Sequence, residues 1–394
     1  MSESAITRTN TRPPFWRNVR VLSIIGQVIF VVIIVVIASW LYGNVTAGMR
    51  RINIGGGYAF MNQPAGFEIG VTPIAYTPTD TYWRAFQVGI VNTLSVTLLG
   101  VVLATFVGLL VGIAQLSSNW LIARLAQVYV AIFRNTPLLV QLFFWWSAVF
   151  LSMPRVQQAI ALPGPIYLSN RGVAMIGLRG TATFLPWLIF VAVGVVLMIV
   201  TVIALRRHQE RTGQQSPRWL IGFGLVVLSA AVGWLILGQP LETHVPERRG
   251  FNFVGGFQLT PEYAALLLGL VIYTGAFIAE IVRSGIQGIS KGQKEAALAL
   301  GLSPQRSMRL VILPQALRII IPPITNQYLN LAKNSSLAIA IGFPDMYNVA
   351  RTISNQTGQV VQIVGLVMAS YLVISLFTSL IMNLYNRSVR LVER

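Results

Sequence analysis

Long apolar runs are the feature that most constrains the fold of this 394-residue chain. Eight of them follow one another, each more than 20 residues long, at 19–41, 85–116, 124–151, 183–205, 218–238, 262–286, 318–341 and 359–386. About 20 consecutive apolar residues cross a bilayer as a helix. A helix also satisfies its own backbone polar groups, which lipid cannot do. The runs therefore predict an all-α integral membrane protein with about eight transmembrane helices.

The composition excludes several other classes of protein. Only 10% of the residues are charged, whereas soluble domains carry about a quarter. The formal net charge is +18, but the basic residues lie in short segments between apolar runs instead of clustering on a soluble face, so no nucleic acid is expected as a partner. The chain has no cysteine, and its two histidines, His208 and His244, lie far apart in the sequence. Neither a disulfide nor a metal site is expected.

The distribution of basic residues predicts how the chain is oriented in the membrane. With the N-terminus inside, the inner segments hold 17 lysines and arginines, the outer segments hold 9, and 3 fall within spans. Lysine and arginine accumulate on the cytoplasmic side of membrane proteins. Both termini are therefore predicted to be cytoplasmic, together with the polar stretch 288–314.

That polar stretch has the pattern of two short helices. Residues 294–300 are good helix formers, and Gly301 follows them at the position of a C-terminal cap. Ser303-Pro304 is typical of the start of a second helix, with proline at the first helical position. Pro314 then predicts a bend towards the membrane. By itself this pattern also fits a surface amphipathic helix.

Four strings of residues occur in an order that resembles one transporter family. They are RNTPLLVQ at 134–141, YTGAFIAEIVR at 273–283, EAA at 295–297 and KNSSL at 333–337. The chain is similar to the polar-amino-acid branch of ABC-importer permeases. Its length and the position of its inserted helices resemble the long permease subunits of general L-amino-acid importers.

The resemblance implies a five-helix permease core, one extra N-terminal helix and an inserted helix pair. The division of the chain is then as follows: cytoplasmic tail 1–20, extra helix 21–42, periplasmic loop 43–84, first part of the core 85–151, insertion with two helices 152–261, second part of the core 262–386 with the coupling loop 288–314, and cytoplasmic tail 387–394. The resemblance also assigns docking on an ATPase to five residues of this loop: Glu295, Ala296, Ala297, Gly301 and Pro314.

The resemblance further implies partners and a place in the cell. The chain has no Gly-x-x-x-x-Gly-Lys-Ser/Thr string, so ATP is expected on a separate ABC ATPase subunit dimer, and this chain needs no cofactor and is not an enzyme by itself. The other expected partners are a second, related permease chain, a periplasmic amino-acid-binding protein, the substrate and the lipid bilayer. The expected location is the bacterial inner membrane.

Ionisable residues within spans are costly and usually line a pathway or pair with each other. Arg134 or Lys333 is predicted to attract the substrate carboxylate, and Glu280 lies in the sixth span. The other residues predicted to shape the pathway are Thr136, Tyr273, Phe277, Asn334 and Ser335. The alternative is structural, because Glu280 can pair with Arg134 across helices or with Arg283 three residues on.

Two other functions compete with ATP-driven import. An ion-gradient-driven secondary amino-acid transporter predicts internal inverted repeats and buried acids, but the sequence shows no clear repeat, and Glu280 is the only acid well inside a span. A membrane scaffold or sensor does not require Arg134 and Lys333 at membrane depth.

Overall fold

Helices make up most of the chain in the computed structural model, which describes residues 19–51, 57–213 and 216–389. Most of the two predicted tails, 1–20 and 387–394, therefore lies outside the described residues. The long helices are α1 (Val19–Arg51), α2 (Tyr82–Ala114), α3 (Trp120–Asn135), α5 (Phe184–Thr212), α6 (Arg218–Leu237), α7 (Pro261–Gln287), α10 (Leu313–Asn334) and α12 (Val360–Val389). The shorter ones are α4 (Leu138–Phe143), α8 (Lys291–Ala299), α9 (Pro304–Ser307) and α11 (Met346–Thr357).

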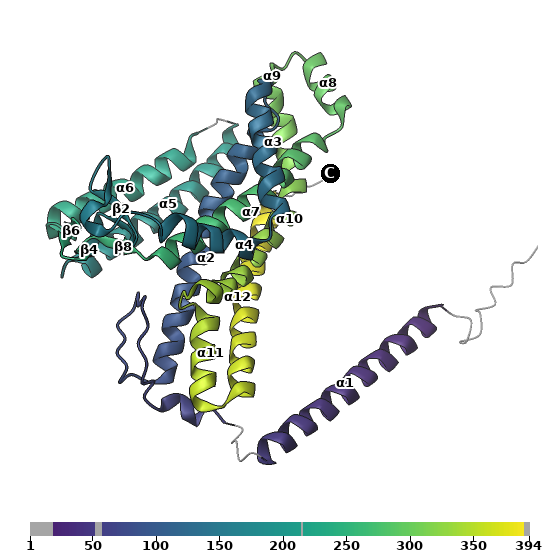
Figure 1. Ribbon diagram of the computed structural model, residues 1–394. Coiled ribbons are helices and arrows are strands. Elements are labelled where there is room, and N and C mark those ends of the chain that lie inside the picture. Colours follow the sequence, from purple (N-terminus) through teal and green to yellow (C-terminus); the bar gives the residue numbers. More distant parts are fainter. Residues whose placement is uncertain (1–18, 52–56, 214–215, 390–394) are drawn as a thin grey trace, which may run out of the picture.

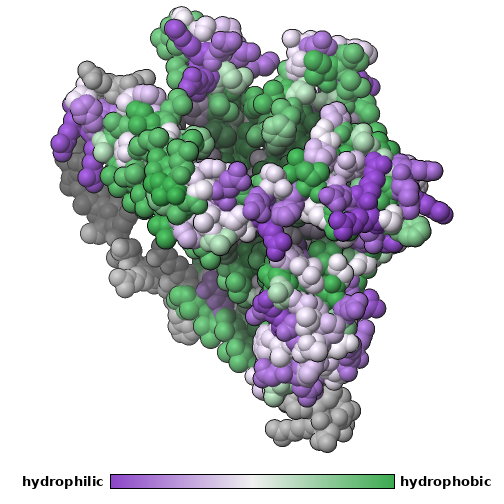
Figure 2. Space-filling model, turned by 90° about the vertical axis from the view of Figure 1, so that its left-hand side faces the viewer, coloured by the Kyte–Doolittle hydropathy of each residue, from purple (hydrophilic) through white to green (hydrophobic). Residues whose placement is uncertain are grey.

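The prediction of about eight membrane spans is confirmed. The described part of the chain contains seven helices long and apolar enough to cross a membrane, and eight if a bent pair at residues 120–150 counts as one span. Hydrophobic residues cover broad areas of the face drawn in Figure 2, whereas hydrophilic residues gather in separate patches. A surface of this kind suits a lipid solvent.

The α2–α7 pair forms the centre of the fold. Gly108 and Gly112 of α2 lie one helical turn apart and bring the two helices into close contact. A Cβ atom at Gly108 would lie 2.5 Å from Cγ2 of Ile278, and one at Gly112 would lie 2.8 Å from the carbonyl oxygen of Ala279. The small-residue spacing of α2 therefore packs the core.

The two ends of the molecule differ in construction (Figure 1). Helices α8 and α9 stand at one end, which we call the α8 end. At the other end, the α11 end, the amphipathic helix α11 packs beside the first halves of α2 and α12. The segment 57–81 also packs there, with Met61 and Ala65 buried against Phe86 and Ile353.

Buried polar groups fix the start of α11. The side-chain amide of Asn92 donates to the carbonyls of Val71 and Pro344, at 2.9 Å each. The hydroxyl of Thr93 accepts from the backbone N–H of Met346 at 2.9 Å. Asp345 caps the helix by accepting from the N–H of Asn348, and its burial raises the pKa of this carboxyl to about 6. These bonds connect α2, the segment 57–81 and α11.

The insertion 152–261 forms a unit beside the core. Helices α5 and α6 pack mainly on each other, and the loops before and after them hold eight short strands. These strands are β1 (Ile160–Leu162), β2 (Ile166–Ser169), β3 (Gly172–Met175), β4 (Gly177–Gly180), β5 (Leu241–His244), β6 (Glu247–Arg249), β7 (Asn252–Val254) and β8 (Phe257–Leu259). Their antiparallel sheets have the orders β1-β2-β3-β8, β4-β5 and β6-β7. The β3–β8 pair joins the two loops directly in front of α7.

Three features of the helices differ from the sequence prediction. Helix α1 continues to Arg51, nine residues into the predicted loop 43–84, because no proline interrupts its backbone hydrogen bonds. Helix α11 was not predicted, because only one of its faces is apolar, so polar residues interrupt the apolar ones in the sequence and its mean hydropathy is low. The third span is not one straight helix, as described below.

Adding side-chain volume at Gly108 is expected to destabilise the α2–α7 pair. Replacing Gly108 with valine forces two methyl groups into the space that Ile278 occupies, and overpacking of this kind costs about 1–3 kcal/mol. The midpoint of thermal unfolding, measured on the detergent-purified protein, should fall. The matched control is Gly224→Val on α6, where no atom lies within 4 Å of the added Cβ. Equal midpoints for both variants would contradict this packing.

Candidate functional site

A break in the third span positions Arg134. Helix α3 ends at Asn135, Thr136 is extended with φ −98° and ψ 127°, and the chain turns by 104° before α4. Pro137 explains the break, because proline disfavours helical geometry in the residue before it. The prediction that the residues 124–151 form one continuous span is therefore wrong. Arg134 lies in the last turn of α3, where the helix dipole favours a positive charge.

The buried side chain of Gln141 holds the broken ends together. Its amide nitrogen donates to the carbonyls of Phe133 and Thr136, at 3.0 Å each. These carbonyls belong to the end of α3 and to the break that follows it. Gln141 itself lies in α4, so this one side chain fixes the angle between the two helices.

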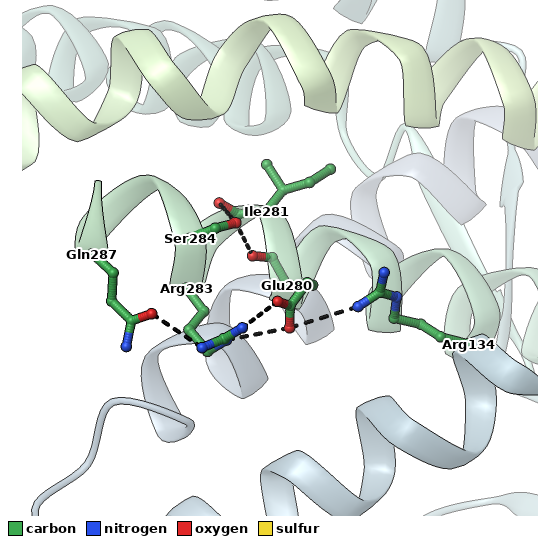
Figure 3. Close-up of polar contacts among 6 residues, drawn as sticks. All are labelled: Arg134, Glu280, Ile281, Arg283, Ser284 and Gln287. Atoms are coloured by element: carbon green, nitrogen blue, oxygen red, sulfur yellow. Dashed lines mark hydrogen bonds and ion pairs between the residues drawn. The ribbon is translucent and has the colours of Figure 1, made fainter. Parts of the chain in front are cut away.

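Glu280 of α7 joins two arginines (Figure 3). Nη1 of Arg134 lies 3.7 Å from Oε2 of Glu280. Arg283, one turn along α7, pairs with both carboxylate oxygens of Glu280 and donates from Nε at 3.2 Å. The guanidinium of Arg134 also lies 5.2 Å from the centre of the Phe277 ring, a cation–π contact. Both pairings proposed from the sequence as the structural alternative are therefore present.

A cavity of about 410 Å³ opens beside this cluster, and we call it the Arg134 pocket. Its lining is mostly polar: Gln115, Gln127, Val130, Ala131, Arg134, Asn135, Glu280 and Arg283. Two arginines face one carboxylate here, so the cluster carries one excess positive charge. The pocket can therefore hold an anionic group without first breaking the pairs of Glu280.

A second cavity of about 440 Å³ lies at the opposite end of α7, and we call it the Glu262 pocket. Its polar lining includes Glu68, Glu262, Asn348 and Thr352. The Glu262 carboxylate accepts from Nε1 of Trp146 at 3.4 Å. Glu262 and Glu280 are 18 residues apart on one helix, which corresponds to about 27 Å. Helix α7 therefore lines a pocket near each of its ends, of opposite excess charge.

The structure brings only part of the predicted pathway together. Arg134 contacts both Phe277 and Glu280, and the ring of Tyr273 packs on that of Phe277 at a tilt of 51°, with ring centres 4.9 Å apart. Thr136 is half-buried, and its hydroxyl donates to the carbonyl of Ile132 at 2.9 Å.

The string Lys333-Asn334-Ser335 does not line the Arg134 pocket. It lies at the end of α10 and the start of a short 3-10 helix, η6 (Ser335–Ile341). Lys333 is exposed, Asn334 is half-buried, and Ser335 is buried with its hydroxyl donating to the carbonyl of Ala332.

Four polar residues of this region were missed as site residues: Gln115, Gln127, Asn135 and Gln141. Each stands within or at the edge of an apolar run, where an uncharged polar side chain is itself a signal. Gln141 also closes the string RNTPLLVQ, which carries the resemblance at this position.

The polar stretch 288–314 forms the two helices predicted for it. Helix α8 ends in a Schellman motif: Gly301 has φ +75°, its N–H bonds the carbonyl of Leu298, and the N–H of Leu302 bonds that of Ala297. Ser303 then caps α9, whose first residue is Pro304. In α8 the side chains of Glu295 and Ala296 are exposed, and Ala297 is buried.

The prediction that the chain bends at Pro314 is wrong. Pro314 lies in the first turn of α10, and helical structure runs from Pro304 to Ile341. A π-helical turn, η5 (Met308–Ile312), comes directly before it. Proline lacks the N–H for a bond to the residue four positions back, and the wider π turn accommodates that loss within the helix.

Apolar side chains are exposed on either side of α9. Leu300, at the end of α8, is 81% exposed, and Leu310, in η5, is 62% exposed. The loop is also tied to α10, because the amide of Gln315 donates to Oε1 of Gln293 at 3.3 Å.

A membrane-spanning helical core with a pocket near each end of one helix is the architecture of a membrane permease. The chain belongs to the family of binding-protein-dependent transport system inner membrane components, whose model matches residues 100–394. It is a multi-pass inner-membrane protein, as members of this family are.

Three relatives match along almost their whole length. The general L-amino acid transport system permease protein AapQ of Rhizobium johnstonii is 45% identical over 94% of this chain and 93% of its own. The putative amino-acid ABC transporter permease protein YhdX of Escherichia coli is 44% identical, with coverages of 93% and 94%. The glutamate/glutamine/aspartate/asparagine permease protein BztB of Rhodobacter capsulatus is 37% identical over 96% of both chains.

Losing the Gln141 bonds is expected to loosen the α3–α4 angle and with it the position of Arg134. In Gln141→Met two buried carbonyls lose their donor, at a cost of about 1–3 kcal/mol. Substrate uptake by the assembled transporter should fall several-fold, with a lower unfolding midpoint. The neighbouring Val140→Met, at a side chain 55% exposed, should match the wild type. Unchanged uptake in Gln141→Met would show that the break does not depend on this side chain.

Proposed function

We propose that this chain is the transmembrane permease subunit of an ATP-binding-cassette importer that moves L-amino acids, with broad specificity, into the cytoplasm. Support for amino acids comes from the three relatives, all described as amino-acid permeases. Support for broad specificity comes from AapQ, whose description names a general L-amino acid system.

The observation that carries the proposal is the geometry of the loop 288–314. The cap at the end of α8 leaves Leu300 exposed. On the same helix the side chains of Glu295 and Ala296 are also exposed, and the small alanine leaves room for a close approach. These features suit insertion into a groove of an ATPase subunit. Gln293 connects the same helix to Gln315 in the first turn of α10. A force applied to α8 therefore reaches a membrane-spanning helix directly.

The two pockets suit alternating access along α7. An amino-acid zwitterion needs a partner for each of its charges. The Arg134 pocket offers its excess positive charge to the carboxylate, and Glu280 can receive the ammonium group if it leaves Arg134. The Glu262 pocket would admit substrate from the opposite side. The pair Tyr273–Phe277 lies between the two pockets and would separate them.

The other partners follow from the family and from the sequence. A dimer of ABC ATPase subunits would bind and hydrolyse ATP, so this chain alone would be no enzyme and would hold no cofactor. A periplasmic binding protein would deliver the substrate, and a second, related permease would complete the pathway. The α8 end would face the cytoplasm, with both termini on that side. Membership of a binding-protein-dependent family gives no support to the ion-gradient alternative.

Substituting Gly301 tests the proposed docking loop. In Gly301→Asp a side chain enters a left-handed backbone position, at a cost of about 1–2 kcal/mol, and a charge enters the exposed apolar turn. The protein should remain in the membrane, lose the ATPase on co-purification and take up less than about a tenth of the wild-type amount. Gly358→Asp is the control, because that glycine also has a left-handed φ, +69°, and open space, but lies at the α11 end. Normal uptake by Gly301→Asp would refute the assignment.

Asn334 tests the predicted substrate pathway. A carboxylate in its place, in Asn334→Asp, should favour cationic over acidic amino acids by about fivefold, the effect of roughly 1 kcal/mol of charge interaction. Competitive uptake of arginine and glutamate into proteoliposomes containing the whole transporter measures the ratio. Asn355→Asp, an exposed position on α11, serves as control. An unchanged ratio in Asn334→Asp would remove this residue from the pathway.

A further inference from the structure

A pocket lies between the end of α5 and the start of α6, remote from the α7 pathway. Its volume is about 420 Å³, and it is lined by Gln209, Ser216, Pro217, Arg218, Trp219 and Leu220. Substrate transfer along α7 does not use this pocket.

Positive charge is concentrated around the pocket. The segment 206–219 holds four arginines and only one acid, Glu210. Glu210 is already paired with Arg206 at 3.0 Å. Arg218 donates from Nη1 to Oε1 of Gln209 at 3.2 Å, which joins the start of α6 to the end of α5. Arg207 and Arg211 add two further charges, so the segment carries an excess of positive charge.

Hydrogen-bond donors in the pocket also lack acceptors. The hydroxyl oxygen of Ser216 is buried and, within the part of the chain that the structure describes, has no hydrogen-bond partner. Pro217 stands at the N-cap of α6 and offers no side-chain acceptor to the first turn. The free N–H groups of a helix start, together with the helix dipole, favour an anion.

The position of the pocket relative to the hydrocarbon layer indicates where such an anion would come from. Trp219 and Leu220 are 64% and 75% exposed, and they begin a helix whose outward side chains are apolar. On α5 the last exposed apolar residues before Arg206 are Ile203 and Ala204. The pocket therefore lies where the hydrocarbon layer ends and phospholipid headgroups begin.

Close packing keeps the pocket in shape. A Cβ atom at Gly222, in the second turn of α6, would lie 2.7 Å from Cγ of Met198. A Cβ atom at Gly194 would lie 2.1 Å from Oγ of Ser229. Because the two helices approach this closely, the ends that form the pocket are held at a fixed distance.

We propose that the pocket between the end of α5 and the start of α6 binds the phosphate-bearing headgroup of an anionic phospholipid. Ser216, Arg218 and the first turn of α6 would contact the phosphate, Arg207 and Arg211 would supply further attraction, and Trp219 would lie at the level of the headgroups. Basic pockets between membrane helices are suited to such headgroups. The inserted helix pair then anchors the permease to anionic lipid, a role independent of the substrate carried.

The test is native mass spectrometry of the full-length protein in its purified complex, titrated with phosphatidylglycerol or with phosphatidylcholine. The wild type should retain phosphatidylglycerol preferentially. Arg218→Gln should weaken that binding about fivefold, and the double variant Arg207→Gln/Arg211→Gln should weaken it further. Arg351→Gln, an exposed arginine on α11, removes the same charge at the other end and should change nothing.

Equal binding of the two lipids by the wild type, or unchanged phosphatidylglycerol binding in both arginine variants, would overturn the proposal. A further arm adds inorganic phosphate at millimolar concentration. If phosphate displaces the lipid and stabilises the wild type equally well, the pocket is a site for the free anion and the lipid assignment is wrong. If phosphate has no such effect, the lipid is the source of the anion.

Discussion

The close contact between α2 and α7 is the constraint on which the rest of the structure depends. Two glycines one turn apart leave no room for side chains between the helices, so their backbones almost touch at Ile278 and Ala279. That contact places the next residue of α7, Glu280, at a fixed depth and direction. In lipid no hydrophobic effect holds helices together, and close van der Waals packing has to do so. The position of the cluster around Glu280 therefore follows from the two glycines of α2, which have no side chains to keep the helices apart.

Helix α7 connects every functional part of the chain. Its start follows the β3–β8 pair and lines the Glu262 pocket, its middle carries the aromatic pair, and its last turns carry Glu280 and Arg283 before the chain enters α8. Gly285, near its end, packs so closely on α10 that a Cβ atom would lie 2.3 Å from Ile320. A shift of α8 can therefore act on α7 and α10 together.

Sequence reasoning predicted most of the fold because hydrophobicity and helix caps act locally. The number of spans and the cap at Gly301 both depend on neighbouring residues. The break at Thr136 was not predicted. Pro137 indicates it, but this proline lies within a long apolar run, and the run was interpreted as one span. The angle of that break depends on Gln141, whose partners lie five and eight residues away across the bend. The strand pairs β3–β8 and β4–β5 were missed because each joins residues far apart in the sequence, such as Val173 with Leu259 and Gly177 with His244.

The site was only partly predictable for a related reason. Charged residues at membrane depth are rare enough that Arg134, Glu280 and Lys333 stand out in the sequence, but which of them meet is decided by helix packing. Arg134 and Glu280 meet because α3 ends beside α7, and the bent chain keeps Arg134 at a helix terminus. Lys333 lies on the exposed side of α10, where no described residue neutralises it. A charged side chain on a membrane helix is costly unless it pairs or reaches water, and in the importer proposed above the second permease would be placed to supply a partner.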